Sequence, residues 1–177
     1  MTGNKPLAMV TGGSSGIGFE LAKQFAKNGF DVAISGLSDK VNEAADALRS
    51  LDAEAYPFKA DASTYDGVEG FWTFTQGLGR PLEAAALNVG IGIGGAFIDN
   101  DLEDEFRLLA INVTGTVHMA KRVVQHMART AAAGSSSHPR FRRPCPRHTK
   151  PSTARRRHSV TCSRNLCARS CARPGSR

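Results

Sequence analysis

Small residues gather near the start of the chain, in the run T-G-G-S-S-G-I-G at residues 11–18. An apolar segment, residues 7–10, precedes this run, and Ile17, Leu21 and Phe25 recur at the four-residue spacing of a helix. A glycine-rich turn between a strand and a helix presents free backbone N–H groups at the positive end of the helix, where phosphates bind. The pattern therefore predicts a site for a phosphate-bearing ligand.

The glycines of this run have separate physical roles. Gly12 permits a tight turn, Gly16 lets the backbone approach a pyrophosphate, and Gly18 allows the helix to pack closely on the strand. A glycine loop with a structural role only is the alternative, but the strand before it and the helix after it favour dinucleotide binding. The residues expected to bind the cofactor are Gly12, Ser14, Ser15, Gly16, Ile17 and Gly18.

Three further positions could carry chemistry. Asp61-Ala62 and Asn88-Val89-Gly90 each follow a predicted strand, at the sheet edge where ligands of open α/β sheets bind. Asn112 lies within a predicted helix, where asparagine is mildly unfavourable, so a functional role is favoured there. The alternatives are a helix N-cap or turn residue for Asp61 and a plain turn after the strand for Asn88.

Alternating elements position these residues. Apolar runs and helical periodicity predict strands over 7–10, 30–35, 54–60 and 84–89, with helices from residue 17 to the stop at Asn28-Gly29 and over 39–50, 67–77 and 101–129. In the last helix, apolar residues from Leu102 to Met127 recur every three or four positions and predict one apolar stripe. Strands that alternate with helices predict a parallel sheet with both faces covered.

The spacing T-G-x-x-x-G-x-G, followed in order by Asp61-Ala62, Asn88-Val89-Gly90 and Asn112, resembles the short-chain dehydrogenase/reductase family over residues 1–129. The resemblance implies an α/β, Rossmann-type doubly wound parallel sheet, here incomplete with about four strands. It implies hydride transfer between NAD(P)H and a small carbonyl or alcohol substrate. In the family, the matching residues are an aspartate that hydrogen-bonds adenine and a catalytic asparagine that bends its helix and holds a water. The long helix resembles one that pairs subunits, so a dimer or tetramer is expected of an intact enzyme.

The choice between NADP and NAD depends on the end of the second strand, where an acidic residue would bind the ribose hydroxyls of NAD. The residues there are Ser35, Gly36, Leu37 and Ser38, without a carboxylate. Gly36 is therefore a further expected contact, and the sequence leans towards NADP, although no arginine is present to bind its extra phosphate.

The charge divides the chain at residue 129. The net charge of +7 combines 11 basic and 16 acidic residues up to Arg129 with 12 basic and no acidic residues from Thr130 onward. We expect a nucleotide-binding domain over 1–129 and an irregular or disordered tail over 130–177. A non-catalytic nucleotide-binding fragment whose basic tail contacts nucleic acid is the alternative function, although the tail has only Phe141 as an aromatic residue.

Other classes of site have little support. A zinc site in the tail would lack any Cys-x-x-Cys pair, so no metal is predicted; its candidate ligands are Cys145, His148, His158, Cys162, Cys167 and Cys171. No apolar stretch reaches membrane-spanning length and the start does not resemble a signal peptide, so a cytoplasmic protein is expected.

The residues for proton transfer are missing. The family pairs a tyrosine with a lysine four residues on, but the only tyrosines here, Tyr56 and Tyr65, precede Asn112. A shifted reading frame uses the last nucleotide of each codon and the first two nucleotides of the next. With free choice of synonymous codons from Ala132 onward, this frame permits a Thr-Ser-Ser segment. It also permits a Tyr-x-x-x-Lys pair at the codons that now encode Ser152 to Arg157. We therefore hypothesise the loss of one nucleotide, or the gain of two, near codons 128–132, which leaves this chain catalytically incomplete.

Overall fold

The computed structural model describes residues 5–133, which form a four-stranded parallel sheet in the order β3-β2-β1-β4. The elements follow one another as β1 (Leu7–Thr11), α1 (Gly16–Lys27), β2 (Asp31–Gly36), α2 (Lys40–Arg49), β3 (Ala55–Lys59), α3 (Tyr65–Gly77), β4 (Leu82–Leu87), the 3-10 helix η1 (Phe97–Asp99), α4 (Leu102–Leu109), the π-helix η2 (Ala110–Gly115) and α5 (Thr116–Ala133).

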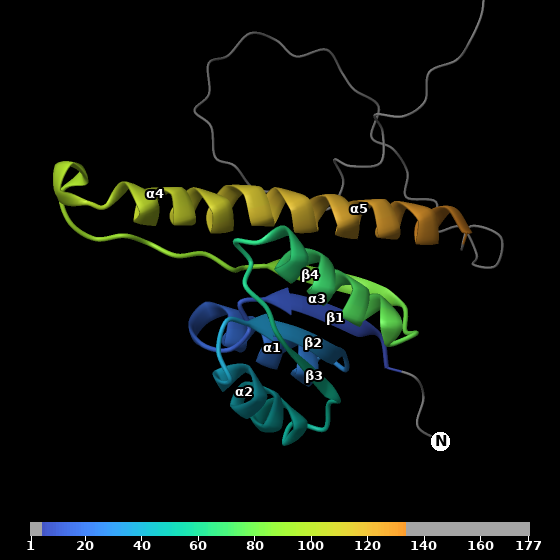
Figure 1. Cartoon of the computed structure of the whole chain (residues 1–177). Helices are drawn as coiled ribbons and strands as arrows, with labels where there is room; N and C mark the ends of the chain where they lie inside the picture. The colour runs from blue at the N-terminus through green and yellow to red at the C-terminus, as the bar shows by residue number, and fades with distance from the viewer. Residues whose placement is uncertain (1–4, 134–177) are drawn as a thin grey trace, which may run out of the picture. The chain divides into compact units, whose positions relative to one another are not determined.

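The two central strands are buried along their whole length. Every residue of β1 and β2 is buried, because helices cover both faces of the sheet. Helices α1 and α2 pack on one face, in a core cluster that includes Ala22, Val41 and Ile34. Helices α3 and α5 cover the other face, around Phe71 and Met119 (Figure 1). The predicted doubly wound α/β architecture is confirmed for the described residues.

Strand boundaries agree with the predicted ones to within about two residues, and the turns form as expected. Gly29, which follows the C-cap Asn28 of α1, has a φ of 81°, a conformation that glycine adopts without strain. Strand β2 begins at Asp31, whose carboxylate pairs with Arg80 at 2.5 Å just before β4. This ion pair connects the amino ends of two strands that lie on either side of β1.

The predicted long helix differs from the structure in two respects. A π-helix, Ala110–Gly115, separates α4 from α5, and the helix continues to Ala133 rather than ending at Arg129. Its apolar residues form two sets rather than one stripe. The buried set is Ile111, Met119 and Val123. The exposed set is Leu102, Phe106, Leu109, Val113, Val117 and Val124.

Several sequence-based expectations concern residues outside the described range. Of the tail predicted over 130–177, the part beyond Ala133 lies there, and with it the zinc and nucleic-acid alternatives and the shifted Tyr-x-x-x-Lys pair. Within residues 5–133, no three His, Cys, Asp or Glu side chains are grouped so that they could hold a metal ion. Also within that range, none of the helices has the length and apolar character needed to cross a membrane.

Candidate functional site

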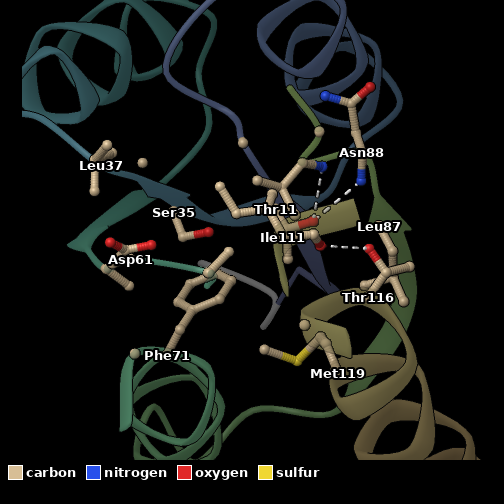
Figure 2. A pocket seen from close by; sticks show the side chains of 18 of the residues that line it. Thr11, Ser35, Leu37, Asp61, Phe71, Leu87, Asn88, Ile111, Thr116 and Met119 are labelled. Atoms are coloured by element: carbon tan, nitrogen blue, oxygen red, sulfur yellow. Dashed lines mark hydrogen bonds between the residues drawn. The ribbon is translucent and has the colours of Figure 1, made fainter. Parts of the chain in front are cut away.

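A pocket of about 410 Å³ opens at the carboxyl ends of β1, β2 and β4 (Figure 2). In the sheet, β2 lies on one side of β1 and β4 on the other, so the strand order reverses at β1. Ligands of open α/β sheets bind at the carboxyl ends of the strands at such a point. The sequence-predicted residues that line it are Gly12, Ser14, Ser15, Ile17, Gly36, Asp61, Ala62, Asn88 and Gly90. Nine predicted contacts from four separate segments therefore meet in one place.

The glycine loop is shaped for close backbone approach. Gly12 has a φ of 68° and Gly16 a φ of 56°, both in the left-handed region that favours glycine. No atom lies within 4 Å of the position that a Cβ of Gly16 would occupy, so the backbone there faces open space. A Cβ on Gly18 would overlap the carbonyl oxygen of Gly12 and lie 2.7 Å from Nδ2 of Asn88. Only glycine lets helix α1 begin this close to the loop.

The amino end of α1 is available to an anion. Its N-cap residue Ser15 makes no side-chain capping bond, and the first turn contains no acidic residue. The first N–H groups of a helix have no partner within the helix and carry partial positive charge. This end of α1 can therefore bind a phosphate group at the mouth of the pocket.

Thr11, a residue that the sequence analysis did not single out as a site residue, connects two strands at the base of the pocket. Its Oγ1 accepts hydrogen bonds from the backbone N–H groups of Asn88, at 3.0 Å, and Val89, at 3.2 Å (Figure 2). The bonds hold the chain after β4 against the end of β1. In the sequence, the position of this threonine directly before the first glycine of the run could have indicated its role.

Asp61 lines the pocket and also forms the turn before α3. Its Oδ1 accepts hydrogen bonds from the Ser63 backbone N–H, at 2.9 Å, and from the Ser63 hydroxyl, at 2.7 Å. The Ser63 hydroxyl and N–H hold the pKa of the Asp61 carboxyl below its usual value, with a contribution from Arg107 at 3.7 Å. Thr64, rather than Asp61, caps α3 through a bond from the Gly67 N–H. Asp61 therefore forms a turn, and among the described residues that line the pocket it is the only one with a charged side chain.

Asn112 does not line the pocket, but its side chain forms hydrogen bonds with the backbone of Ile91, which does. Its Nδ2 donates to the Ile91 carbonyl at 2.8 Å, and its Oδ1 accepts from the Ile91 N–H at 2.9 Å. These bonds hold Ile91, in the segment after β4 that lines the pocket, against the π-helix. Gly16 and Gly18 are the other predicted residues outside the lining, where they shape the loop.

The π-helix gives Asn112 this position. In the same turn, Thr116 Oγ1 donates to the carbonyl of Ile111, five residues earlier, at 3.3 Å (Figure 2). Gly115 lies against the chain after β3, since a Cβ there would overlap the carbonyl oxygen of Ala62. Where the family resemblance implied a local bend, the structure has a six-residue π-helix, a feature frequent at functional sites.

The apolar wall of the pocket was missed by the sequence analysis. It includes Phe71 from α3, Leu87 from the end of β4 and Met119 from α5 (Figure 2). Each of these residues also belongs to a core cluster or packs against one. Their periodicity marks them as core residues, and only the fold reveals that one side of each side chain faces a pocket.

The geometry agrees with comparisons to known proteins. The sequence model of the short chain dehydrogenase family matches residues 6–135. The chain belongs to the short chain dehydrogenase family. It is 32% identical over 129 residues to the probable oxidoreductase EphD of Mycobacterium tuberculosis, covering 72% of this chain and 22% of EphD.

Solved structures of the family have the same fold. A short-chain type dehydrogenase/reductase from Mycobacterium marinum superimposes with a TM-score of 0.65 and 31% identity, covering 71% of this chain and 51% of that protein. L-sorbose reductase from Gluconobacter frateurii superimposes with a TM-score of 0.65 and 26% identity, covering 71% and 49%. The chain therefore spans about half of these structures and less than a quarter of EphD.

Proposed function

We propose that this chain is the cofactor-binding half of an NAD(P)-dependent oxidoreductase that transfers hydride to or from a small carbonyl or alcohol substrate. The observation that carries the proposal is the glycine loop, whose residues Gly12, Ser14, Ser15 and Ile17 line the pocket beside the uncapped start of α1. The solved structure of the related L-sorbose reductase is a complex with NADPH and L-sorbose. That complex supports a nicotinamide cofactor for this family member.

The pocket fits such a cofactor in shape and chemistry. Its volume lies in the range of small-molecule sites, and its walls are mostly apolar with a few polar groups. The open space beside Gly16 and the free N–H groups at the start of α1 suit a pyrophosphate. Asp61, which also lines the pocket, provides a carboxylate acceptor that suits the amino group of adenine.

Different segments of the chain would bind different parts of the cofactor. The loop around Gly16 would hold the phosphates, and the backbone at Asn88 and Gly90 would lie along the cofactor at the end of β4. Asn112 is proposed as a positioning residue, because it acts through the backbone of Ile91. The bound cofactor supplies hydride chemistry, and the protein supplies orientation and exclusion of water.

The chain lacks the group expected to move the proton. An unperturbed tyrosine titrates near pH ~10, so the family's proton transfer depends on a lysine that lowers the tyrosine pKa. Both tyrosines of this chain make other contacts. Tyr56 is on β3 and bonds Arg80 through its hydroxyl, and Tyr65 begins α3, stacked on His118. We therefore propose that the chain as written binds cofactor without turnover.

Binding can be tested with a matched pair of glycine variants. Gly16 and Gly29 both have positive φ and open space at the Cβ position, so an alanine at either costs a similar backbone strain of about 1 kcal/mol. Only Gly16 lies at the proposed phosphate site. NADPH titrated into the chain should bind saturably, Gly16→Ala should weaken binding at least tenfold, and Gly29→Ala should leave it unchanged. Equal loss in both variants would contradict the site.

Turnover tests the second part of the proposal. Resequencing the gene across codons 127–138 would establish the frame, and a version shifted near codons 128–132 can be made directly. The frame-shifted product should consume NADPH with a panel of ketones and aldehydes, whereas the chain as written should not. Turnover by the chain as written would contradict its catalytic incompleteness.

A further inference from the structure

The π-helix Ala110–Gly115 contacts two segments of the pocket that are far apart in the sequence. One of them is the segment after β3, because a Cβ on Gly115 would overlap the carbonyl oxygen of Ala62. The same Cβ position lies 3.3 Å from the carbonyl oxygen of Ala110. A side chain at residue 115 would therefore displace either the π-helix or the segment that contains Asp61.

The second contact is with the segment after β4. Asn112 exchanges two hydrogen bonds with the backbone of Ile91, at 2.8 and 2.9 Å, and a Cβ on Gly90 would lie 3.3 Å from its Oδ1. Strands β3 and β4 are the two edge strands of the described sheet, so the segments that follow them do not come from neighbouring strands. The π-helix therefore connects two pocket segments through Gly115 and Asn112.

Thr116, the residue after the π-helix, holds this turn in place. Its Oγ1 donates a hydrogen bond at 3.3 Å to the carbonyl oxygen of Ile111, and the Ile111 side chain is buried (Figure 2). A π-helix is wider than an α-helix and occurs as single turns, so it depends on such local support. Closely packed elements transmit strain, and a displacement of Gly115 would therefore reach Asn112 within the same turn.

We propose that the π-helix couples the two segments, with Gly115 and Thr116 as positioning residues. Order in the segment around Asp61 favours order in the segment around Ile91, and the coupling acts through Asn112. It is a property of the chain without ligand and is reciprocal, as a coupling free energy must be. Its use rests on the proposed function: a nucleotide bound at Asp61 would also fix the segment after β4, which would lie along the rest of the cofactor.

The test is amide hydrogen exchange in the ligand-free chain, measured at two N–H groups. The Ser63 N–H reports on the segment after β3 through its bond to the Asp61 carboxylate. The Ile91 N–H reports on the segment after β4 through its bond to Asn112. Gly115→Ala should accelerate exchange about threefold or more at both groups, although residue 115 is in neither segment.

Two further variants separate coupling from a general loss of stability. Gly77→Ala is the matched control, because Gly77 is also a helical glycine but has no atom within 4 Å of its Cβ position, and it should accelerate exchange at neither group. In the background of Asn112→Ala, Gly115→Ala should no longer accelerate exchange at Ile91. If Gly115→Ala does not fold, Thr116→Val replaces it: loss of the hydroxyl should accelerate exchange at Ile91 severalfold, and only when Asn112 is present.

Reciprocity provides a second check, since Asn112→Ala should also accelerate exchange at Ser63. Acceleration confined to Ser63 in Gly115→Ala, or acceleration at Ile91 that persists in full without the Asn112 amide, would overturn the coupling. NADPH titration answers a separate question. If the wild-type chain does not bind NADPH, the proposed function fails, while exchange in the ligand-free chain still decides the coupling.

Discussion

At the base of the pocket, a single hydroxyl satisfies two backbone donors. Thr11 is buried, and its Oγ1 is the acceptor for the N–H groups of both Asn88 and Val89. Thr11→Val keeps the shape but removes the acceptor, and each polar group left without a partner costs about 1–3 kcal/mol. We expect the free energy of unfolding, measured by urea denaturation, to fall by about 2 kcal/mol or more.

Thr11→Ser is the matched control, because serine keeps the oxygen and loses only a methyl group. It should lose about 1 kcal/mol, the value of a buried methyl group. Equal losses in the valine and serine variants would show that packing, and not the hydrogen bonds, makes Thr11 important.

Asn112 offers a local test of its positioning role. Asn112→Ala removes both bonds to Ile91, while the higher helix propensity of alanine offsets about 0.6 kcal/mol of the loss. Global stability should therefore change little, and amide hydrogen exchange at Ile91 should accelerate about tenfold, as for a local loss of ~1.4 kcal/mol. Asn42→Ala, on the exposed surface of α2, should leave that exchange rate unchanged.

At this scale, the sequence predicted which residues gather but not how each one acts. Glycine, aspartate and asparagine at the ends of predicted strands were sufficient to locate the pocket. The partners of those residues depend on details of the local turn for Asp61 and on a tertiary contact for Asn112. The Oδ1 of Asp61 turned out to be engaged by Ser63 two residues away, and the amide of Asn112 by Ile91, 21 residues away.

Helix pairing provides a pH-dependent contact at the scale of elements. Glu69 on α3 accepts one hydrogen bond from Arg122 Nε at 2.6 Å, and its Oε1 lies 2.6 Å from Nε2 of His118; both partners are on α5. The Arg122 hydrogen bond is the main reason that the pKa of Glu69 is lowered. A lowered carboxyl pKa stabilises the fold above the unfolded-state pKa of about 4.3, and this stabilisation is lost as pH falls through the folded-state value.

We therefore expect the urea midpoint of the chain to fall between pH 6 and pH 3, and Glu69→Gln to reduce that fall. Asp66, exposed in the first turn of the same helix and without a resolved ion pair among the described residues, provides the control variant Asp66→Asn. If Glu69→Gln and Asp66→Asn had the same pH dependence, the bridge between α3 and α5 would not contribute.

The long helix shows why the presence of a helix is easier to predict than which of its faces is buried. Apolar spacing from Leu102 to Met127 identified the helix correctly, yet hydrophobic periodicity cannot distinguish a face that packs on the sheet from one that does not. The π-helix at 110–115 was also invisible to a 3.6-residue pattern, because it depends on Asn112 and Gly115 fitting against other segments.

For the molecule as a whole, the exposed apolar face of α4 and α5 predicts self-association. Phe106 and Val117 are 61% and 64% exposed, and large exposed apolar patches mark interfaces or cause aggregation. The double variant Phe106→Lys, Val117→Lys should reduce the concentration dependence of the mass measured by light scattering. Its free energy of unfolding should change by less than about 1 kcal/mol, since surface substitutions rarely exceed ~0.5 kcal/mol each.

Val123→Lys is the contrasting variant, because Val123 is buried in the core beneath the same helix. It should unfold the chain, since an unpaired buried charge is costly. An equal loss of stability in the double surface variant would mean that Phe106 and Val117 are covered in solution by something that stabilises the fold.

Hydrogen–deuterium exchange with and without NADPH tests the central claim, that the pocket at the carboxyl ends of β1, β2 and β4 binds a nicotinamide cofactor. We predict that NADPH slows exchange in residues 12–18, in the segment after β3 around Asp61 and in residues 88–91, while the far ends of α1 and α2 are unaffected. Exchange that is unchanged by saturating NADPH, or slowed only outside these segments, would contradict the account.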